Sequence, residues 1–324
     1  MFKSVSYKSK QFFALSIKLF IVIGCFYFIY QKTNTNQQQS FSDFRAILTK
    51  NDIFSLKNIL FLSIFTVFNW FLEISKWKIL VKKIQNISFF EATIQSLASL
   101  TASLITPNRI GEYGVKALYY KKVFRKKIVV LNFIGNISQL LITFVFGIIG
   151  CTYLYFNFTI DIKPINILYF IIIIISLFLS FWFINKKQVT FKGYSFKTLK
   201  NYIRDFSKKS IKKIMLFSLF RYIIFSHQFY FLLLIFNVEI EYYNALMCIF
   251  SMYLIASIIP MLSLFDVVLK GSVAIFIFSF FQINETTILA IVLLMWIFNF
   301  MLPSIVGSYF VLTFNTDKLI QPKE

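Results

Sequence analysis

The sequence of 324 residues is poor in the side chains that build metal centres, disulfides and acidic active sites. It contains one histidine, three cysteines and 13 aspartates and glutamates, and the cysteines all lie in apolar runs: Cys25, Cys151 and Cys248. Cysteines in such runs are typical of small packed residues rather than of a disulfide or a metal-ligand set. The sequence also lacks a Walker loop and a dinucleotide-binding fingerprint. We therefore expect no metal and no cofactor, and we find no set of residues typical of catalysis.

Hydrocarbon side chains are abundant instead. Hydrophobic residues make up 58% of the chain, aromatic residues 20%, and phenylalanine alone occurs 44 times. Several apolar runs reach the length of about 20 residues that a membrane-spanning helix needs, for example residues 165–184 and 287–312. A membrane β-barrel would show alternating segments of about 10 residues. The pattern therefore predicts an all-α polytopic membrane protein that forms one integral membrane domain over residues 1–324.

Six apolar runs are continuous and two are interrupted. We expect about six spanning helices, near residues 12–30, 58–75, 128–153, 165–184, 214–236 and 287–312. The first run lacks a small-residue cleavage site, so it is interpreted as a retained helix and not as a signal peptide. The stretches of about 91–119 and 244–281 are broken near their middles by proline and charge, which predicts two re-entrant or broken hairpins.

The formal net charge is +21. This charge could suggest nucleic-acid binding, but the cations gather in the loops between apolar runs, so we expect no nucleic-acid partner. The expected partners are membrane phospholipids, including anionic or lipid-linked ones, while the sequence leaves protein partners and the oligomeric state open. The positive-inside rule places both termini and the loops 76–90, 119–127 and 185–213 in the cytoplasm. We expect a bacterial cytoplasmic (inner) membrane, with the basic loop 185–213 against its anionic leaflet.

This topology predicts an internal repeat. The order span, span, hairpin, span occurs twice, in halves of about 12–156 and 165–312, and Pro107 and Pro260 are 153 residues apart. Three crossings separate equivalent points, so the halves have opposite orientations and their hairpins enter from opposite faces. Inverted repeats with interrupted helices near the midplane are typical of transporters.

The tip of the first hairpin has the sequence TPNRIGEYGVKALYY, residues 106–120. Pro107 and Gly111 predict a turn, which at membrane depth must be covered by protein or water. If a helix follows, Glu112 and Lys116 share one face, so the charges near the tip can largely satisfy one another. Charges in a bilayer also tend to mark a site, so Arg109 is a candidate to bind phosphate, and Glu112 to contact a cationic headgroup or carry a proton. The structural alternative is a salt bridge that only fixes the hairpin.

The second tip repeats the order of the first. Pro260 is followed by Asp266, then by Lys270 four residues later and by Gly271. Pro260 and Gly271 are expected to shape this hairpin. Asp266 and Lys270 are expected to take part in substrate binding or translocation. The residues expected to share this role at the first tip are Arg109, Glu112 and Lys116.

For the other polar residues in the apolar runs, we expect structural roles before functional ones. We expect Glu73 to form an interfacial ion pair one turn from Lys76, and Arg221 to extend toward the cytoplasmic surface. His227 is expected to hydrogen-bond a neighbouring helix, with a proton relay as the alternative. A polar stripe on the third expected span, residues 128–153, either bonds to another helix or lines the same cavity as the tips. Its members are Asn132, Asn136 and Gln139.

The two tips resemble motifs of the lysylphosphatidylglycerol synthase transmembrane (flippase-like) family, and the resemblance extends over essentially the whole chain. TPNRIGEYGVKALYY is similar to the family's P-G-x-x-G-E segment through Pro107, Gly111 and Glu112, with Arg109 as the neighbouring cation. IPMLSLFDVVLKGSVA resembles its later segment of proline followed by an acid. The resemblance implies lipid translocation, or a link to lipid-linked glycan or hopanoid pathways. Asn108 replaces the first glycine of the pattern. Because no soluble synthase domain follows residue 312, aminoacyl transfer to lipid is not expected.

Three functions remain open from the sequence. The leading hypothesis is a translocator that moves a phospholipid or a lipid-linked headgroup between leaflets by alternating exposure of a midplane site. The second is an intramembrane lipid-modifying transferase with Glu112 or Asp266 as its base. The third is a lipid-binding partner subunit that does not transport.

Overall fold

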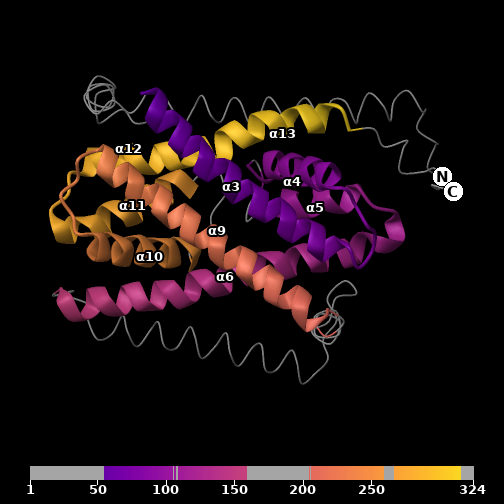
Figure 1. The fold of residues 1–324 in the computed structure, drawn as a ribbon, viewed down its shortest axis with the longest axis horizontal. Helices are drawn as coiled ribbons and strands as arrows, with labels where there is room; N and C mark the ends of the chain where they lie inside the picture. The colour runs from indigo at the N-terminus through magenta and orange to yellow at the C-terminus, as the bar shows by residue number, and fades with distance from the viewer. Residues whose placement is uncertain are drawn as a thin grey trace, which may run out of the picture.

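The computed structural model describes residues 55–104, 106, 109–158, 204, 206–258 and 266–314, and every regular element within them is a helix (Figure 1). Two of the expected spans, 12–30 and 165–184, lie outside the described residues. So do Pro107, Pro260, most of the basic loop 185–213 and both chain termini.

Four described helices are long and apolar enough to cross a membrane. They are α3 (Leu56–Val81), α6 (Lys122–Asn157), α9 (Lys208–Ile235) and the continuous run of α12 (Glu285–Trp296), the π-helical turn η2 (Ile297–Met301) and α13 (Leu302–Leu312). These helices coincide with the spans expected near 58–75, 128–153, 214–236 and 287–312. Side chains at their starts act as caps: Ser55, Ser207 and Asn284 each accept a hydrogen bond from a backbone N–H of the first turn.

The two interrupted stretches form pairs of short helices. The first hairpin consists of α4 (Phe89–Leu104) and α5 (Ile110–Leu118), and the second of α10 (Tyr242–Ile258) and α11 (Asp266–Phe278), which a 3-10 turn η1 (Ser279–Phe281) extends. The longest of these helices has 17 residues, fewer than the roughly 20 that a crossing needs. In each hairpin the two helices pack against each other, and the hairpins lie toward opposite ends of the long axis (Figure 1).

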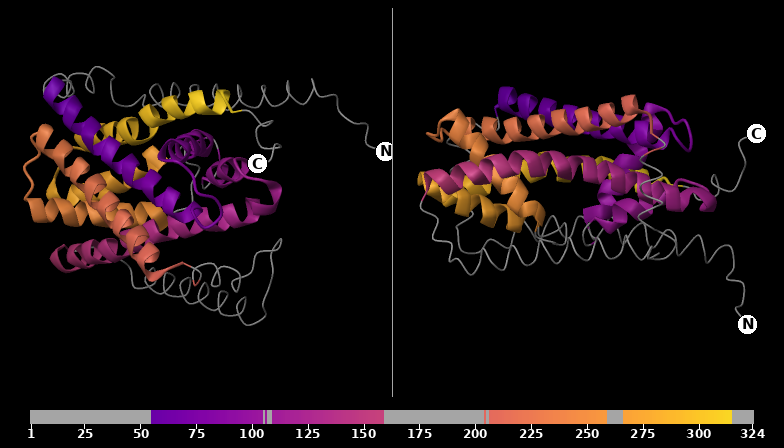
Figure 2. Two further views of the ribbon diagram at one scale, coloured as in Figure 1. Left: turned by 45° about the vertical axis from the view of Figure 1, so that its right-hand side comes forward. Right: turned by 90° about the horizontal axis from the view of Figure 1, so that it is seen from below.

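The remaining contacts tie the hairpins to helices that are distant in sequence. Helices α3 and α9 pack side by side, α10 packs along α6, and α4 packs along α13 (Figure 2). Glycines allow the last two contacts to be close. A Cβ on Gly147 of α6 would lie 2.2 Å from the Leu254 Cβ of α10, and a Cβ on Gly307 of α13 would lie 2.2 Å from the Leu97 carbonyl oxygen of α4.

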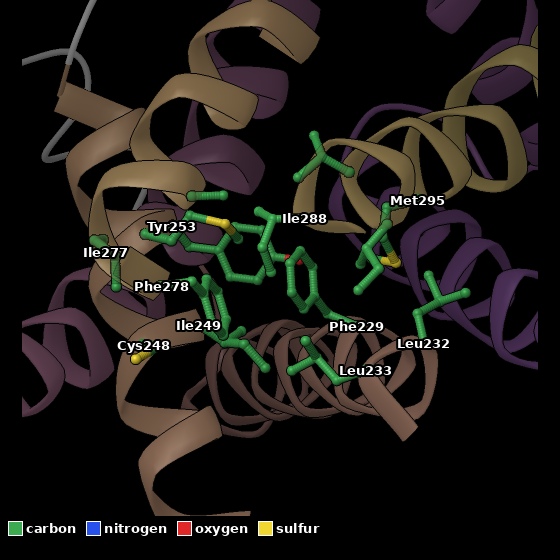
Figure 3. Close-up of a cluster of buried hydrophobic side chains, with 14 of the residues drawn as sticks. Phe229, Leu232, Leu233, Cys248, Ile249, Tyr253, Ile277, Phe278, Ile288 and Met295 are labelled. Atoms are coloured by element: carbon green, nitrogen blue, oxygen red, sulfur yellow. The ribbon is translucent and has the colours of Figure 1, made fainter. Parts of the chain in front are cut away.

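The apolar interior has two parts. The larger cluster joins α9, α10, α11 and α12, and Figure 3 shows several of its members, including Phe229 and Phe278, whose rings stack with centroids 5.7 Å apart. The smaller cluster joins α3, α4, α5 and α6 around Trp77 and Leu80. The ionic groups described below lie beside this smaller cluster.

Candidate functional site

Both hairpins border one cavity of about 610 Å3. Residues of α3, α4, α5, α6, α9, α10, α11 and η2 line it, so it lies where the two halves of the chain meet. Three of the lining residues are cations, Arg109, Arg221 and Lys270, and no acidic residue is among the described residues that line it. The other polar lining groups are mainly side-chain amides and hydroxyls, and the amides are Asn69, Asn136, Gln139 and Asn299.

The charges of the first tip form a triad around Glu112. Arg109 Nη2 lies 3.0 Å from Glu112 Oε2, and Lys116 Nζ lies 2.9 Å from Glu112 Oε1, so the pairing expected from the spacing is present. The glutamate and lysine side chains are 3% and 2% exposed, whereas the arginine side chain is 40% exposed. Lys116 therefore neutralises Glu112 in the interior, and Arg109, the second partner of Glu112, lines the cavity.

Local backbone geometry brings Arg109 to that position. Arg109 precedes α5 in the left-handed conformation, with a φ of 58°, which is rare for a residue with a side chain. Gly111 follows, and its N–H donates to Thr106 Oγ1 at 2.8 Å. A Cβ on Gly111 would lie 2.4 Å from the Ala102 carbonyl oxygen, so glycine is what allows α5 to begin against the end of α4.

Lys116 has other contacts besides its ion pair with the Glu112 carboxylate. Its Nζ donates to Asn132 Oδ1 at 2.8 Å and lies 4.4 Å from the centre of the Trp77 ring. The Trp77 indole in turn donates to Gln95 Oε1 at 2.8 Å, and Tyr120 donates to the same oxygen at 2.8 Å. Burial raises the pKa of the Tyr120 phenol above its ordinary value.

A second triad surrounds Glu73 on α3. Lys76 Nζ lies 2.8 Å from Glu73 Oε2, and Arg221 of α9 donates to the same carboxylate oxygen and, through Nε, to Asn69 Oδ1 at 2.8 Å. The ion pair of Glu73 with Lys76 that the sequence predicts is therefore present, and Glu73 is 7% exposed. The contact of Arg221 with this pair was not expected from the sequence. Glu73 and Arg221 lie 148 positions apart, which spacing along one helix cannot reveal.

The π-helical turn η2 extends this network and was not expected from the sequence. Asn299 accepts from Asn69 Nδ2 at 3.0 Å and donates to Gln228 Oε1 at 2.8 Å. Pro303 of α13 has no N–H to donate to the Asn299 carbonyl one turn earlier. The Trp70 indole donates to that carbonyl instead, at 3.1 Å. Proline four residues after an asparagine inside an apolar run was the available signal for this turn.

At the second tip the structure describes less. α11 begins at Asp266, whose side chain lies outside the described residues, as Pro260 does. Lys270 lines the cavity, with its Nζ 5.3 Å from the centre of the Phe300 ring of η2. Gly271 faces Leu289 of α12. The structure therefore brings Lys270 to the same cavity as Arg109.

Of the polar stripe of α6, two residues line the cavity and the third bonds to another helix. Asn136 and Gln139 line the cavity, and Asn136 Nδ2 donates to Tyr113 OH at 3.0 Å. Asn132 instead binds Lys116, as described above. His227 does not line the cavity: its ring nitrogens lie 2.8 Å from the Ile223 carbonyl oxygen and 2.8 Å from Tyr242 OH of α10.

This arrangement can bind an anion. Three cations and several amide and hydroxyl donors surround a space large enough for a lipid headgroup, and aromatic rings form much of the remaining wall. Among the described residues, no group of three or more His, Cys, Asp or Glu side chains could hold a metal ion.

Comparison with known protein families gives one result. The family model described as "Lysylphosphatidylglycerol synthase TM region" matches residues 15–307. No curated protein and no solved structure matches the chain.

Proposed function

The chain belongs to the lysylphosphatidylglycerol synthase TM region family, and from that premise we propose that it translocates a phospholipid or lipid-linked headgroup between leaflets. The family and the four long apolar helices make it an integral membrane protein. One observation carries the proposal: the cavity between the two hairpins presents Arg109, Arg221 and Lys270 and lies among helices of membrane-spanning length. Cations so placed are costly unless an anion or an internal carboxylate meets them.

An inverted repeat is part of the proposal. Adding 153 to the bounds of α4 gives 242–257, against Tyr242–Ile258 for α10, and the same shift moves α3 to 209–234, against Lys208–Ile235 for α9. The packing supports the same pairing, because α4 meets the last helix of the second half and α10 meets the last helix of the first. Hairpins that lie toward opposite ends of the molecule would then enter from opposite faces of the membrane (Figure 1).

In this mechanism the cavity is the midplane site and the hairpins are its two gates. The headgroup enters beside one hairpin, its phosphate meets Arg109, Arg221 and Lys270, and relative movement of the halves exposes it beside the other hairpin. Amide groups of Asn69 and Asn136 supply neutral hydrogen bonds to the polar part of the headgroup, while the acyl chains stay in the lipid.

Reconstitution tests the proposal. Liposomes that contain the purified chain and a fluorescently labelled phosphatidylglycerol in one leaflet should lose the leaflet asymmetry faster than empty liposomes. Arg109→Gln should slow this movement at least about tenfold, because a charge-assisted hydrogen bond to phosphate contributes roughly that factor. Lys121→Gln removes an equal charge from an exposed loop residue and serves as the matched control. Unchanged movement in Arg109→Gln, or no movement with the wild-type chain, contradicts the proposal.

The topology is proposed together with the mechanism. The turn between α3 and α4, with Lys82 and Lys83, would face the cytoplasm, whereas the turn before α10, with Glu239 and Glu241, would face the other side. Single cysteines placed at Lys83 and at Glu239 should react with a membrane-impermeant maleimide from opposite sides of sealed membranes. Labelling of both from one side would exclude this topology.

A further inference from the structure

Three buried side-chain amides form a row that ends at Arg221 on the cavity wall. The members of this amide row are Asn69 of α3, Asn299 of η2 and Gln228 of α9, and each is at most 2% exposed. Arg221 Nε donates to Asn69 Oδ1 at 2.8 Å, and Asn69 Nδ2 donates to Asn299 Oδ1 at 3.0 Å. Asn299 Nδ2 in turn donates to Gln228 Oε1 at 2.8 Å. An arginine that lines the cavity is therefore joined to amides from three separate helical elements.

The far end of the amide row is fixed by backbone carbonyls, which can only accept hydrogen bonds. Gln228 Nε2 donates to the Leu62 carbonyl oxygen at 3.1 Å, which leaves Gln228 Oε1 as the acceptor for Asn299. Asn299 Nδ2 also donates to the Met295 carbonyl oxygen at 3.0 Å. Both amide hydrogens of Asn299 are thus used within the protein, so its Oδ1 is the atom that must face Asn69.

The near end of the amide row requires the same direction. A guanidinium can only donate, so the oxygen of Asn69 must face Arg221 and its nitrogen must face Asn299. If the Asn69 amide were rotated by half a turn, N–H would oppose N–H at Arg221, and oxygen would oppose oxygen at Asn299. Because both ends require one orientation of the Asn69 amide, the contact with Asn299 favours the state in which Asn69 accepts from Arg221.

The amide row also sets the direction of the guanidinium. Asn69 binds Nε of Arg221, and the Glu73 carboxylate binds Nη1. Two bound nitrogens fix the plane of the planar guanidinium, and with it the direction of the third nitrogen, Nη2. The Arg221 side chain is 19% exposed and lines the cavity, so its bonds to Asn69 and Glu73 determine how it can meet a phosphate there.

We propose that Asn299 is a positioning residue of the headgroup site and acts through Asn69 on Arg221. This inference rests on the proposed function, in which Arg221 meets the phosphate of the headgroup. Asn299 does not itself bind the ligand, because both its amide hydrogens donate to protein acceptors. Its oxygen holds the Asn69 amide in the orientation that accepts from Arg221, so the guanidinium is already ordered before a phosphate arrives. Ordering before binding lowers the entropy that binding costs.

Hydrogen exchange at Arg221 Nε tests the positioning without any ligand. The chain has five arginines, so isotope labelling of arginine Nε gives few signals, and the signal that Arg221→Lys removes is assigned to Arg221. Asn299→Leu should raise the exchange rate of this N–H by about fivefold, which is the factor that one hydrogen bond contributes. Gln95→Met is the matched control, because it replaces a buried glutamine outside the amide row and should leave the rate unchanged. An unchanged rate in folded Asn299→Leu overturns the proposal.

A milder variant decides the question if Asn299→Leu does not fold. Gln228→Met removes the acceptor of one Asn299 hydrogen and leaves the bond to the Met295 carbonyl. The exchange rate at Arg221 should then rise by only about twofold. A rate equal to that of the wild-type chain in Gln228→Met would overturn the proposal in that case.

Lipid binding tests whether the positioning acts on the ligand. Isothermal titration calorimetry would measure dihexanoyl phosphatidylglycerol binding to the purified full chain in detergent, for Asn299→Leu, Arg221→Gln and the double variant. Asn299→Leu should weaken binding by about threefold when Arg221 is present and should have no further effect once Arg221 is replaced. Equal losses in the two backgrounds would show that Asn299 supports the protein and not Arg221 in particular, which overturns the proposal.

The two measurements separate this inference from the proposed function. Unchanged lipid binding in Arg221→Gln, or no lipid movement with the wild-type chain in liposomes, contradicts the proposed function. The exchange rate at Arg221 decides in either case whether Asn299 positions the guanidinium, because that measurement needs no lipid ligand.

Discussion

The two hairpins have similar outlines and different interiors. The first packs its shorter helix through ions, since Glu112 and Lys116 are two of the three buried residues of α5. The second packs α11 through hydrocarbon, with Phe278 fully buried and stacked on Phe229 of α9 (Figure 3). Both present a cation to the same cavity. The comparison shows that one backbone arrangement can be held by charge pairing on one side and by apolar packing on the other, and that the two sides should respond differently to substitution.

Loss of the charge at the first hairpin should have the largest effect. Glu112→Leu would leave Lys116 buried without its carboxylate, which costs about 3 to 5 kcal/mol of unfolding free energy. Thermal unfolding in detergent measures this as a lowered midpoint. Glu239→Leu, at an exposed position, is the matched control and should change stability by less than about 1 kcal/mol. Equal effects of the two changes would show that the triad contributes nothing to stability.

Loss of a buried aromatic ring from the second hairpin should lower stability somewhat less, and this effect should not depend on charge. Phe278→Ala removes a fully buried ring and should destabilise the protein by about 3 kcal/mol. Because Phe278 does not line the cavity, the affinity of the folded variant for phosphatidylglycerol should stay at the wild-type value. A changed affinity would mean that the apolar hairpin takes part in headgroup binding.

The contacts that both hairpins make through glycine should be similarly sensitive. Gly307→Val would force a side chain against the Leu97 carbonyl of α4, and Gly147→Val would force one against Leu254 of α10, at a cost of about 1 to 3 kcal/mol each. Gly114→Val is the control, because a Cβ there meets nothing within 4 Å. Chemical denaturation of the three variants would compare them, and tolerance at either buried glycine would argue against the close helix contact there.

The smallest effect is expected at the edge of the first hairpin. Tyr120→Phe removes one hydrogen bond to Gln95, which keeps its bond from Trp77, and should cost about 1 kcal/mol. Burial raises the Tyr120 pKa in the folded chain, so its stabilising contribution is complete below the unfolded pKa of about 10 and is lost as pH rises above it. Stability measured from pH 8 to 11 should therefore fall less steeply in Tyr120→Phe. An identical slope would show that the phenol titrates equally in both states.

Much of the fold could be predicted from local sequence. Runs of apolar residues located α3, α6, α9 and the α12–α13 helix, and the breaks at the prolines located both hairpins. The pairing of Glu112 with Lys116 followed from their spacing on one helix. These features depend on neighbours within a few residues, which is the range over which sequence patterns act directly.

The Glu73 triad could not be predicted in this way, because its arginine comes from a helix 148 residues away. The ion pair of Glu73 with Lys76 followed from their spacing on one helix, whereas the contact of Glu73 with Arg221 did not. The network around Asn299 was missed for a related reason. Its π-helical turn depends on Pro303, and the carbonyl that Pro303 leaves is satisfied by Trp70, a residue of another helix.

The packing of α4 on α13 also has a consequence for biosynthesis. The helix α13 is made about 200 residues after α4, which at typical translation speeds is a delay on the order of 10 to 40 s. During that interval Thr101 of α4 lacks the Ser304 carbonyl of α13, to which its hydroxyl donates in the finished protein. A ribosome that stalls before residue 302 would therefore leave a nascent chain in which α4 has not yet packed on α13.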